Sequence, residues 1–98
     1  MDTVIKLVST TFSEDSRKQT IAIETDREVF AKRKSISSKE FFQASERGLK
    51  PQLVVEVRAF EYNGEEVAIV DGKRYTIYRS YTNANEFVEL YLESRSGS

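Results

Sequence analysis

The sequence predicts a mainly β protein: a small antiparallel β-barrel or two-sheet sandwich of six to seven strands, with one short α-helix inserted between strands. Three observations favour this fold. Most apolar side chains lie in short runs that are β-branched or alternate with polar residues. Two dipeptides typical of tight hairpin turns, Asn-Gly and Asp-Gly, separate such runs in the second half. Helix start and stop signals bound one segment near the middle.

The length of 98 residues fits one domain. We expect this domain to cover residues 1–93. The last five residues, 94–98, contain no apolar side chain, and we expect them to form a flexible tail.

The first third of the chain predicts strands on either side of a loop. Thr3 to Val8 is rich in β-branched residues and predicts a strand. Ser9 to Lys18 is polar and predicts an exposed loop, disordered in a free monomer and ordered on docking. The apolar residues between Gln19 and Ile36 are interrupted at Asp26-Arg27, which leaves either two strands or one long bent strand.

The helix is expected from about residue 38 to residue 47. Ser37 and Glu40 have the spacing of a capping box, in which each residue satisfies a backbone amide at the helix start. Gly48 can adopt the left-handed conformation of a C-terminal cap, and Pro51 blocks continuation.

Two adjacent phenylalanines distinguish this helix. Phe41 shares a face with Ala44, whereas Phe42 points about 100° away. We expect one phenylalanine to anchor the helix to the sheet. The other would lie at the edge of that contact, where it is available to a partner.

The second half of the chain predicts four more strands. Asn63-Gly64 and Asp71-Gly72 predict type I′ turns that would make the first three a meander. On the last strand Val88, Leu90 and Leu92 share an apolar face, while Phe87, Glu89 and Tyr91 share an aromatic and acidic one. The strands are expected at Gln52 to Tyr62, Glu65 to Val70, Lys73 to Ser80 and Phe87 to Glu93.

Composition removes several classes of enzyme. The chain has no histidine and no cysteine, so a His-based triad, a Cys-His pair and thiolate or imidazole metal sites cannot be built. No nucleotide-binding or nucleophile-elbow motif occurs. The acids near the expected turns, Glu61, Glu65, Glu66 and Asp71, are expected to be solvated. We expect no enzyme, no cofactor, no metal and no small-molecule substrate.

Charge and hydropathy give two further expectations. The net charge is −1, so no global field attracts nucleic acid. Basic clusters at Arg17-Lys18, Lys32 to Lys34 and Lys73-Arg74 nevertheless occur in a chain with recurring tyrosines, which leaves a single-strand nucleic-acid-binding barrel as an alternative. No signal peptide or membrane-spanning segment is expected.

Four segments in order resemble a known family. They are S-x-x-E-F-F-x-A-x-x-x-G-L-K-P at residues 37–51, FEYNGEE at 60–66, DGKRYTIYRSY at 71–81 and VELYLE at 88–93. Together they resemble the phage head–tail adaptor family, the head closure or stopper proteins of tailed phages and prophages. The resemblance runs from about Thr25 to Glu93.

The resemblance implies a small β-barrel that forms a ring in the virion neck after synthesis in the host cytoplasm. The ring would dock under the portal and adaptor after DNA packaging, keep the genome from leaking and receive the tail. DNA would later pass through its channel without sequence-specific binding. Another neck or tail-completion protein of similar fold remains the alternative within this class.

A ring requires two different complementary faces on each subunit. We expect one on the helix side and one on the aromatic-acidic face of the last strand. The candidate interface residues are Phe41, Phe42, Leu49 and Lys50 on the first, and Phe87 and Tyr91 on the second.

Overall fold

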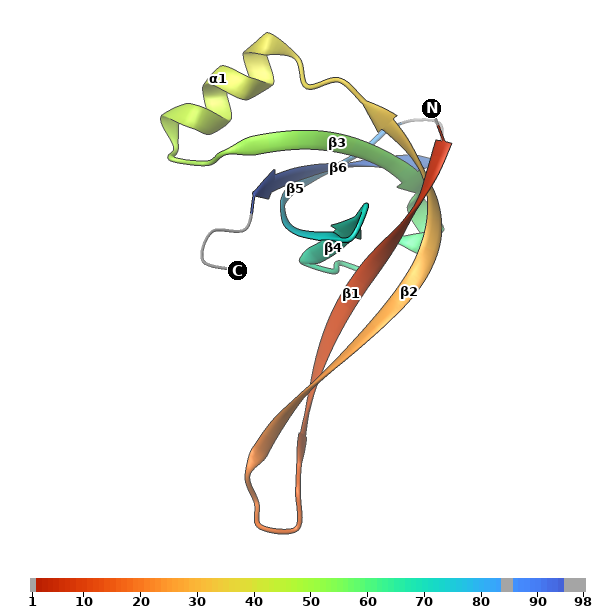
Figure 1. Ribbon diagram of the computed structural model, residues 1–98, viewed down its shortest axis with the longest axis vertical. Coiled ribbons are helices and arrows are strands. Elements are labelled where there is room, and N and C mark those ends of the chain that lie inside the picture. Colours follow the sequence, from red (N-terminus) through yellow and green to blue (C-terminus); the bar gives the residue numbers. More distant parts are fainter. Residues whose placement is uncertain (1, 84–85, 95–98) are drawn as a thin grey trace.

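The computed structural model describes residues 2–83 and 86–94. Within these ranges the chain forms a closed antiparallel barrel of six strands in the order β1-β2-β3-β6-β5-β4, with one α-helix outside it (Figure 1). The predicted fold class is therefore confirmed, as the barrel alternative. The elements are β1 (Asp2–Glu14), β2 (Thr20–Lys34), α1 (Ser38–Glu46), β3 (Pro51–Arg58), the 3₁₀ turn η1 (Ala59–Glu61), β4 (Val67–Val70), β5 (Lys73–Thr82) and β6 (Phe87–Ser94).

The core fills the barrel with side chains from every strand. Each strand directs alternate residues inward, and the predicted inner face of β6 is confirmed, since Val88, Leu90 and Leu92 are almost completely buried. Fully burying side chains of this size stabilises the fold by about 1.5–3 kcal/mol each. The remaining members of the core cluster are Ile5, Leu7, Val29, Ala31, Leu53, Val55, Val57, Ala68, Val70 and Ile77.

One of the two predicted hairpin turns is present. Asp71 and Gly72 both have positive φ, 52° and 78°, as a type I′ turn requires. They join β4 to β5, and Val70 pairs with Lys73.

The Asn63-Gly64 hairpin and the meander built on it are wrong. Strand β3 pairs with β2 and β6, whereas β4 pairs with β1 and β5. Strand β3 ends at Arg58 rather than Tyr62, and the chain turns through η1 to cross one end of the barrel. Gly64 has φ +84°, but Asn63 is not in the positive-φ region. Barrel closure requires β4 beside β1, and this requirement overrides a local turn signal.

The loop expected at Ser9 to Lys18 is also wrong, because most of it is strand. β1 continues to Glu14 and β2 is one strand starting at Thr20, the long-strand alternative. Their pairing is in register from Asp2↔Lys32 to Glu14↔Thr20. The β-branched threonines of this segment suit a strand. A tight turn closes the hairpin: the Asp15 carboxylate accepts hydrogen bonds from the backbone amides of Arg17 (2.8 Å) and Gln19 (2.9 Å).

The outer half of this hairpin projects from the barrel as a twisted two-stranded ribbon (Figure 1). We call residues 9–25 the arm. Strand β1 pairs with β4 only from Lys6 to Val8, and β2 pairs with β3 only from Lys32 to Lys34. The arm is the main reason that the molecule measures 50 Å along one axis and 29 Å and 24 Å along the others.

The helix starts and ends at the predicted signals. The Ser37 hydroxyl accepts a hydrogen bond from the Glu40 amide (3.1 Å). At the other end Gly48 has φ +80°, and the amides of Gly48 and Leu49 donate to the carbonyls of Ser45 and Ala44, which is a Schellman motif. Pro51 begins β3, which is compatible with its missing amide.

The expected phenylalanine anchor is wrong. Glu40 and Ala44 are the buried residues of α1, whereas Phe41 is 48% exposed and Phe42 is 66% exposed. Residues i and i+4 share a helix face, and the small Ala44 side chain allows close approach to the barrel. The tail expected at 94–98 falls mainly outside the described residues, and Ser94 is the last residue of β6.

Candidate interaction surfaces

A buried carboxylate fixes the position of helix α1. Glu40 is 8% exposed and accepts hydrogen bonds from the Tyr78 hydroxyl (2.9 Å) and the Arg79 guanidinium (2.6 Å), both on β5. In the predicted capping box its side chain would have returned to Ser37, so that half of the prediction is wrong. Burial and the hydrogen bond to Glu40 together raise the pKa of Tyr78. The hydroxyl therefore remains a donor to Glu40 at neutral pH.

Polar contacts continue from this anchor across the outer face of β6. The Arg79 guanidinium lies 4.3 Å from the ring centroid of Tyr91, and the Tyr91 hydroxyl donates to Glu89 (2.9 Å). Lys34 bridges Glu89 (2.8 Å) and Glu56 (3.2 Å). The Lys34 hydrogen bond holds the pKa of Glu89 below its usual value. This network ties β2, β3, β5, β6 and the helix together on one side of the barrel.

The two candidate interface residues of β6 are partly covered by these contacts. Tyr91 lies under Arg79 and beside Tyr78, with ring centroids 6.2 Å apart. Phe87 has the Arg58 guanidinium 5.4 Å from its ring centroid. Both side chains are half-buried, so this face offers a mixed aromatic and cationic surface.

The helix candidates lie on the open side of α1. The rings of Phe41 and Phe42 form an edge-to-face pair with centroids 6.3 Å apart and planes at 81°, a preferred aromatic geometry. Leu49 is half-buried and Lys50 is exposed just beyond the helix end. Helix α1 lies at the end of the molecule away from the arm (Figure 1).

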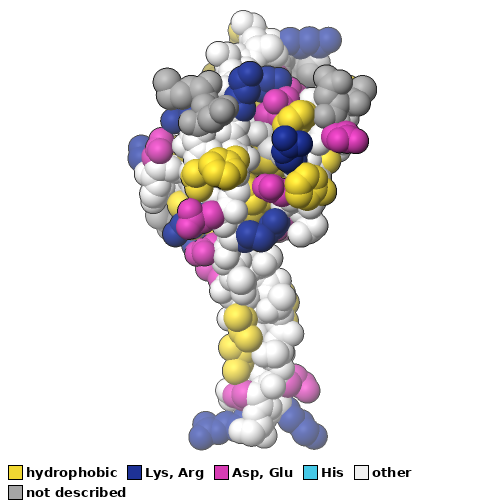
Figure 2. Space-filling model, turned by 90° about the vertical axis from the view of Figure 1, so that its right-hand side faces the viewer, with side chains coloured by type: hydrophobic (Ala, Val, Ile, Leu, Met, Phe, Trp, Pro, Cys, Tyr) yellow, Lys and Arg dark blue, Asp and Glu magenta, His cyan; other side chains and the backbone are white. Residues whose placement is uncertain are grey.

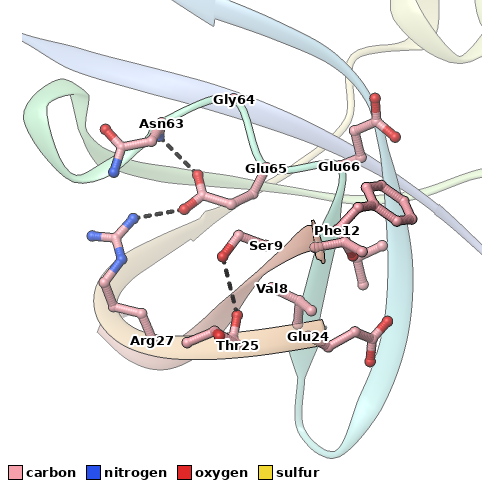
Figure 3. A pocket seen from close by; sticks show the side chains of 12 residues that line it. Val8, Ser9, Phe12, Glu24, Thr25, Arg27, Asn63, Gly64, Glu65 and Glu66 are labelled. Atoms are coloured by element: carbon pink, nitrogen blue, oxygen red, sulfur yellow. Dashed lines mark hydrogen bonds and ion pairs between the residues drawn. The ribbon is translucent and has the colours of Figure 1, made fainter. Parts of the chain in front are cut away.

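A groove of about 740 Å³ lies where the arm joins the barrel (Figure 3). Glu65 lies at the floor of this groove and is only 8% exposed. The expectation that this acid is solvated is therefore wrong. Its carboxylate accepts hydrogen bonds from Arg27 (2.8 Å) and the Asn63 amide (2.7 Å). Burial works against the ionised form, but these bonds outweigh it and lower the pKa of Glu65. Arg27 also donates to the Glu61 carbonyl.

The walls of this groove come from the base of the arm and the start of β4. Figure 3 shows the Ser9 hydroxyl donating to the Thr25 carbonyl across the ribbon, at 3.3 Å. Glu66 is exposed at the rim. The full lining is Val8, Ser9, Thr10, Phe12, Glu24, Thr25, Arg27, Asn63, Gly64, Glu65, Glu66 and Val67.

A second hollow of about 500 Å³ lies between β2 and β3, where the two strands diverge. Phe30 and Phe87 line it together with Lys32, Glu56 and Arg58. Phe30 is 78% exposed. Figure 2 shows apolar side chains separated by charged ones on this side of the barrel. Such a surface is typical of protein contacts rather than of a ligand pocket.

Sequence reasoning missed Phe30 and Arg27 as surface features, and it expected an exposed loop where the arm is a strand hairpin. Phe30 could have been recognised by period-two alternation with the buried Val29 and Ala31. Arg27 had no local signal, since its partner Glu65 lies 38 residues further along the chain.

The part of the chain that the structure describes offers neither a metal-binding cluster nor a membrane-spanning helix. In residues 2–83 and 86–94 no group of three or more acidic, histidine or cysteine side chains is placed to hold a metal ion. Over the same ranges no helix is long and apolar enough to span a membrane.

Comparison of the sequence with known proteins does not assign the chain to a family. No model of a known protein family matches the chain, and no characterised protein matches it significantly.

Proposed function

We propose that this chain is a structural subunit of a phage head–tail connector, a head-closure protein that forms a ring in the virion neck. In this role it closes the portal channel after DNA packaging and joins the head to the tail. One observation carries the proposal. The small barrel has a buried apolar core, and it still leaves several large apolar side chains exposed on its surface. Phe12, Phe30, Phe42 and Phe60 are each more than 60% exposed. Two of them belong to aromatic groups, since Phe42 pairs with Phe41 and Phe30 lines a hollow together with Phe87, and grouped aromatic side chains favour contact with a protein partner.

The resemblance of residues 37–51, 60–66, 71–81 and 88–93 to head-closure proteins supplies the specific class. The barrel and its inserted helix are compatible with that class. The near-neutral net charge of −1 also suits a channel that DNA crosses, because each added phosphate contact would tighten non-specific binding.

The single-strand nucleic-acid-binding alternative has less support. Base stacking needs exposed aromatic rings beside basic side chains. Of the recurring tyrosines, Tyr75 packs against the core and Tyr78 is hydrogen-bonded to Glu40, whereas Tyr81 is 55% exposed. One exposed ring of this set does not make a stacking platform. A fluorescence-anisotropy titration at low salt tests this alternative, and salt-sensitive micromolar binding would favour it.

The proposal is tested by adding the purified chain to DNA-filled heads that carry a portal and lack their own closure protein. We expect added density at the neck in negative-stain images, and genome retention where heads without the chain leak. A head with an unfilled portal is the matched control. Absence of density at the neck, together with unchanged leakage, would overturn the proposal.

A further inference from the structure

The arm has two strand edges without a partner among the described residues. Strand β1 loses its outer neighbour where β4 begins at Val67, opposite Val8. Strand β2 has β3 beside it only from Lys32 onward. Between these points and the turn, the arm is paired only with itself. Alternate residues on each outer edge therefore direct backbone amides and carbonyls away from the ribbon.

The shaft of the arm, residues 9–13 and 20–23, lacks the features that usually prevent strand addition. Proteins protect an edge with charged side chains, proline or a bulge. The stretches 9–13 and 20–23 contain none of these residues and no charge, and the β1–β2 register is unbroken. Figure 2 shows charged side chains gathered at the far end of the arm, with a largely uncharged shaft above them.

Apolar side chains remain exposed on the shaft. Phe12 is 70% exposed, Ile21 42% and Ile23 46%. A two-stranded ribbon in water is marginally stable by itself. Additional strands alongside it would satisfy the open edges and cover these side chains.

The groove at the arm base continues the open edge of β1. Its wall includes Ser9, Thr10 and Phe12 of β1, and β4 stops at its inner end with Val67. A strand added to β1 would enter this groove along the line that β4 follows inside the barrel. Strand addition of this kind draws its affinity from backbone hydrogen bonds.

A second copy of this chain supplies a fitting edge. β1 runs outward along the arm and β2 runs back, so the β1 edge of one arm and the β2 edge of a parallel arm pair antiparallel. The open β1 segment, residues 9–14, corresponds to the outer part of the longer open β2 edge, because it pairs in register with residues 20–25 within one chain. The two edges differ, so the contact is head-to-tail and can close into a ring.

The charges of the arm are compatible with this packing. Near the turn two acids, Glu14 and Asp15, are balanced by two bases, Arg17 and Lys18, so neighbouring tips carry no net repulsion. One face of the ribbon has no charged side chain. By the β1–β2 register this face consists of Ser9, Thr11, Ser13, Ile21, Ile23 and Thr25.

We propose that the arms of neighbouring copies pair edge to edge, β1 of one with β2 of the next, into a continuous antiparallel sheet around the ring. This inference rests on the proposed ring assembly and names the contact that holds it. The groove beside Ser9 receives the neighbouring strand.

The chain contains no cysteine, so single cysteines report this contact cleanly. If the ring axis is parallel to the arm, the rotation that relates neighbouring copies leaves the height of each residue along that axis unchanged. Thr11 pairs with Ile23 within one chain, and Thr11 of one copy therefore faces Ile23 of the next. We would mix full-length Thr11→Cys with an affinity-tagged Ile23→Cys chain and oxidise the mixture. Ile21→Cys and Thr25→Cys cover a register shift of two residues. A disulfide requires Cα atoms within about 7 Å.

The expected result is a mixed disulfide dimer that exceeds the two same-variant dimers combined. Lys39→Cys, on the exposed face of α1, gives the level of random collision. Ile21→Lys, added to the tagged Ile23→Cys chain, places a charge on the open β2 edge two residues from the cross-link, and we expect it to abolish the mixed dimer with Thr11→Cys. Preference for same-variant dimers, or cross-linking no higher than with Lys39→Cys, would overturn the inference.

The same variants separate this inference from the proposed function. If the chains enter particles but the mixed dimer is absent there, the arm contact is wrong and the connector role stands. If the chains do not enter particles, the connector role is wrong. The concentrated mixture in solution then decides the arm contact by the outcomes above.

Discussion

Replacing Glu40 with alanine should release helix α1 from the barrel while the barrel stays folded. The change removes two hydrogen bonds to a carboxylate that is 8% exposed. Bonds to charged groups contribute about 1.5–3 kcal/mol each, but the Arg79 side chain is 41% exposed, so water replaces much of its contribution. We therefore expect a loss of about 2–3 kcal/mol, dominated by the Tyr78 contact.

The loss should be local, because a helix of nine residues is not stable alone. Hydrogen exchange of peptides covering residues 38–50 measures this loss of helix stability. We expect the protection of their amides to fall roughly 30- to 150-fold, while the protection of the β3 and β6 amides stays nearly unchanged. Glu40→Gln keeps an acceptor for Tyr78 and should lose about half as much free energy. Glu46→Ala, an exposed position on the same helix, is the matched control. Equal protection in the Glu40 and Glu46 variants would refute the role of the buried carboxylate.

Three further changes probe other parts of the chain. Phe42→Ser should change stability by less than about 0.5 kcal/mol, because the side chain is 66% exposed, but impair ring or neck assembly in a complementation assay. Normal assembly, equal to that of the neighbouring Gln43→Ser control, would remove Phe42 from the interface. The pKa of Glu89 is lowered by Lys34, so its stabilising effect is present above about pH 4.3 and is lost as pH falls through the lower folded value. Glu89→Gln should therefore flatten the acid limb of urea-derived stability, and an unchanged limb would contradict this. Gly72→Ala meets no atom within 4 Å at φ +78°, so its expected cost of about 1–2 kcal/mol is backbone strain alone, and a smaller shift in the urea midpoint would mean that the turn relaxes.

Local signals predicted the parts of this fold that depend on neighbours in sequence. The inner face of β6 follows from period-two alternation of Val88, Leu90 and Leu92. The helix ends follow from Ser37 and Gly48, because each acts on backbone groups within a few residues. These features could be read without knowing which strand lies beside which.

Features that depend on distant pairing could not be predicted in this way. Asn63-Gly64 has the same local chemistry as Asp71-Gly72, but only the second dipeptide joins two strands that pair with each other. Glu40 has capping-box spacing, yet its side chain binds Arg79, 39 residues further along the chain. In a closed barrel, the strands that must be adjacent decide which of these local preferences are realised.

The arm illustrates why polarity alone is a poor guide to loops. A strand buried on one face shows alternation of apolar and polar residues, whereas a ribbon that leaves the barrel has solvent on both faces and loses that pattern. Residues 9–18 were expected to be a loop for this reason, although their threonines favour strands. The continuous register with residues 20–25 could only be found by pairing the two segments.

In the proposed connector role, the arm and helix α1 have different partners. The arm projects from one end of the molecule, and the Phe41–Phe42 pair lies on the helix at the other (Figure 1). The arm shaft offers uncharged backbone edges, whereas the helix offers two aromatic rings 6.3 Å apart. A two-fold dimer that pairs arm with arm would leave both helices uncovered, and one that pairs helix with helix would leave both arms uncovered. An arrangement in which the arms contact neighbouring copies and the helices meet a different protein covers both, and a subunit positioned between two other layers of a neck meets that requirement.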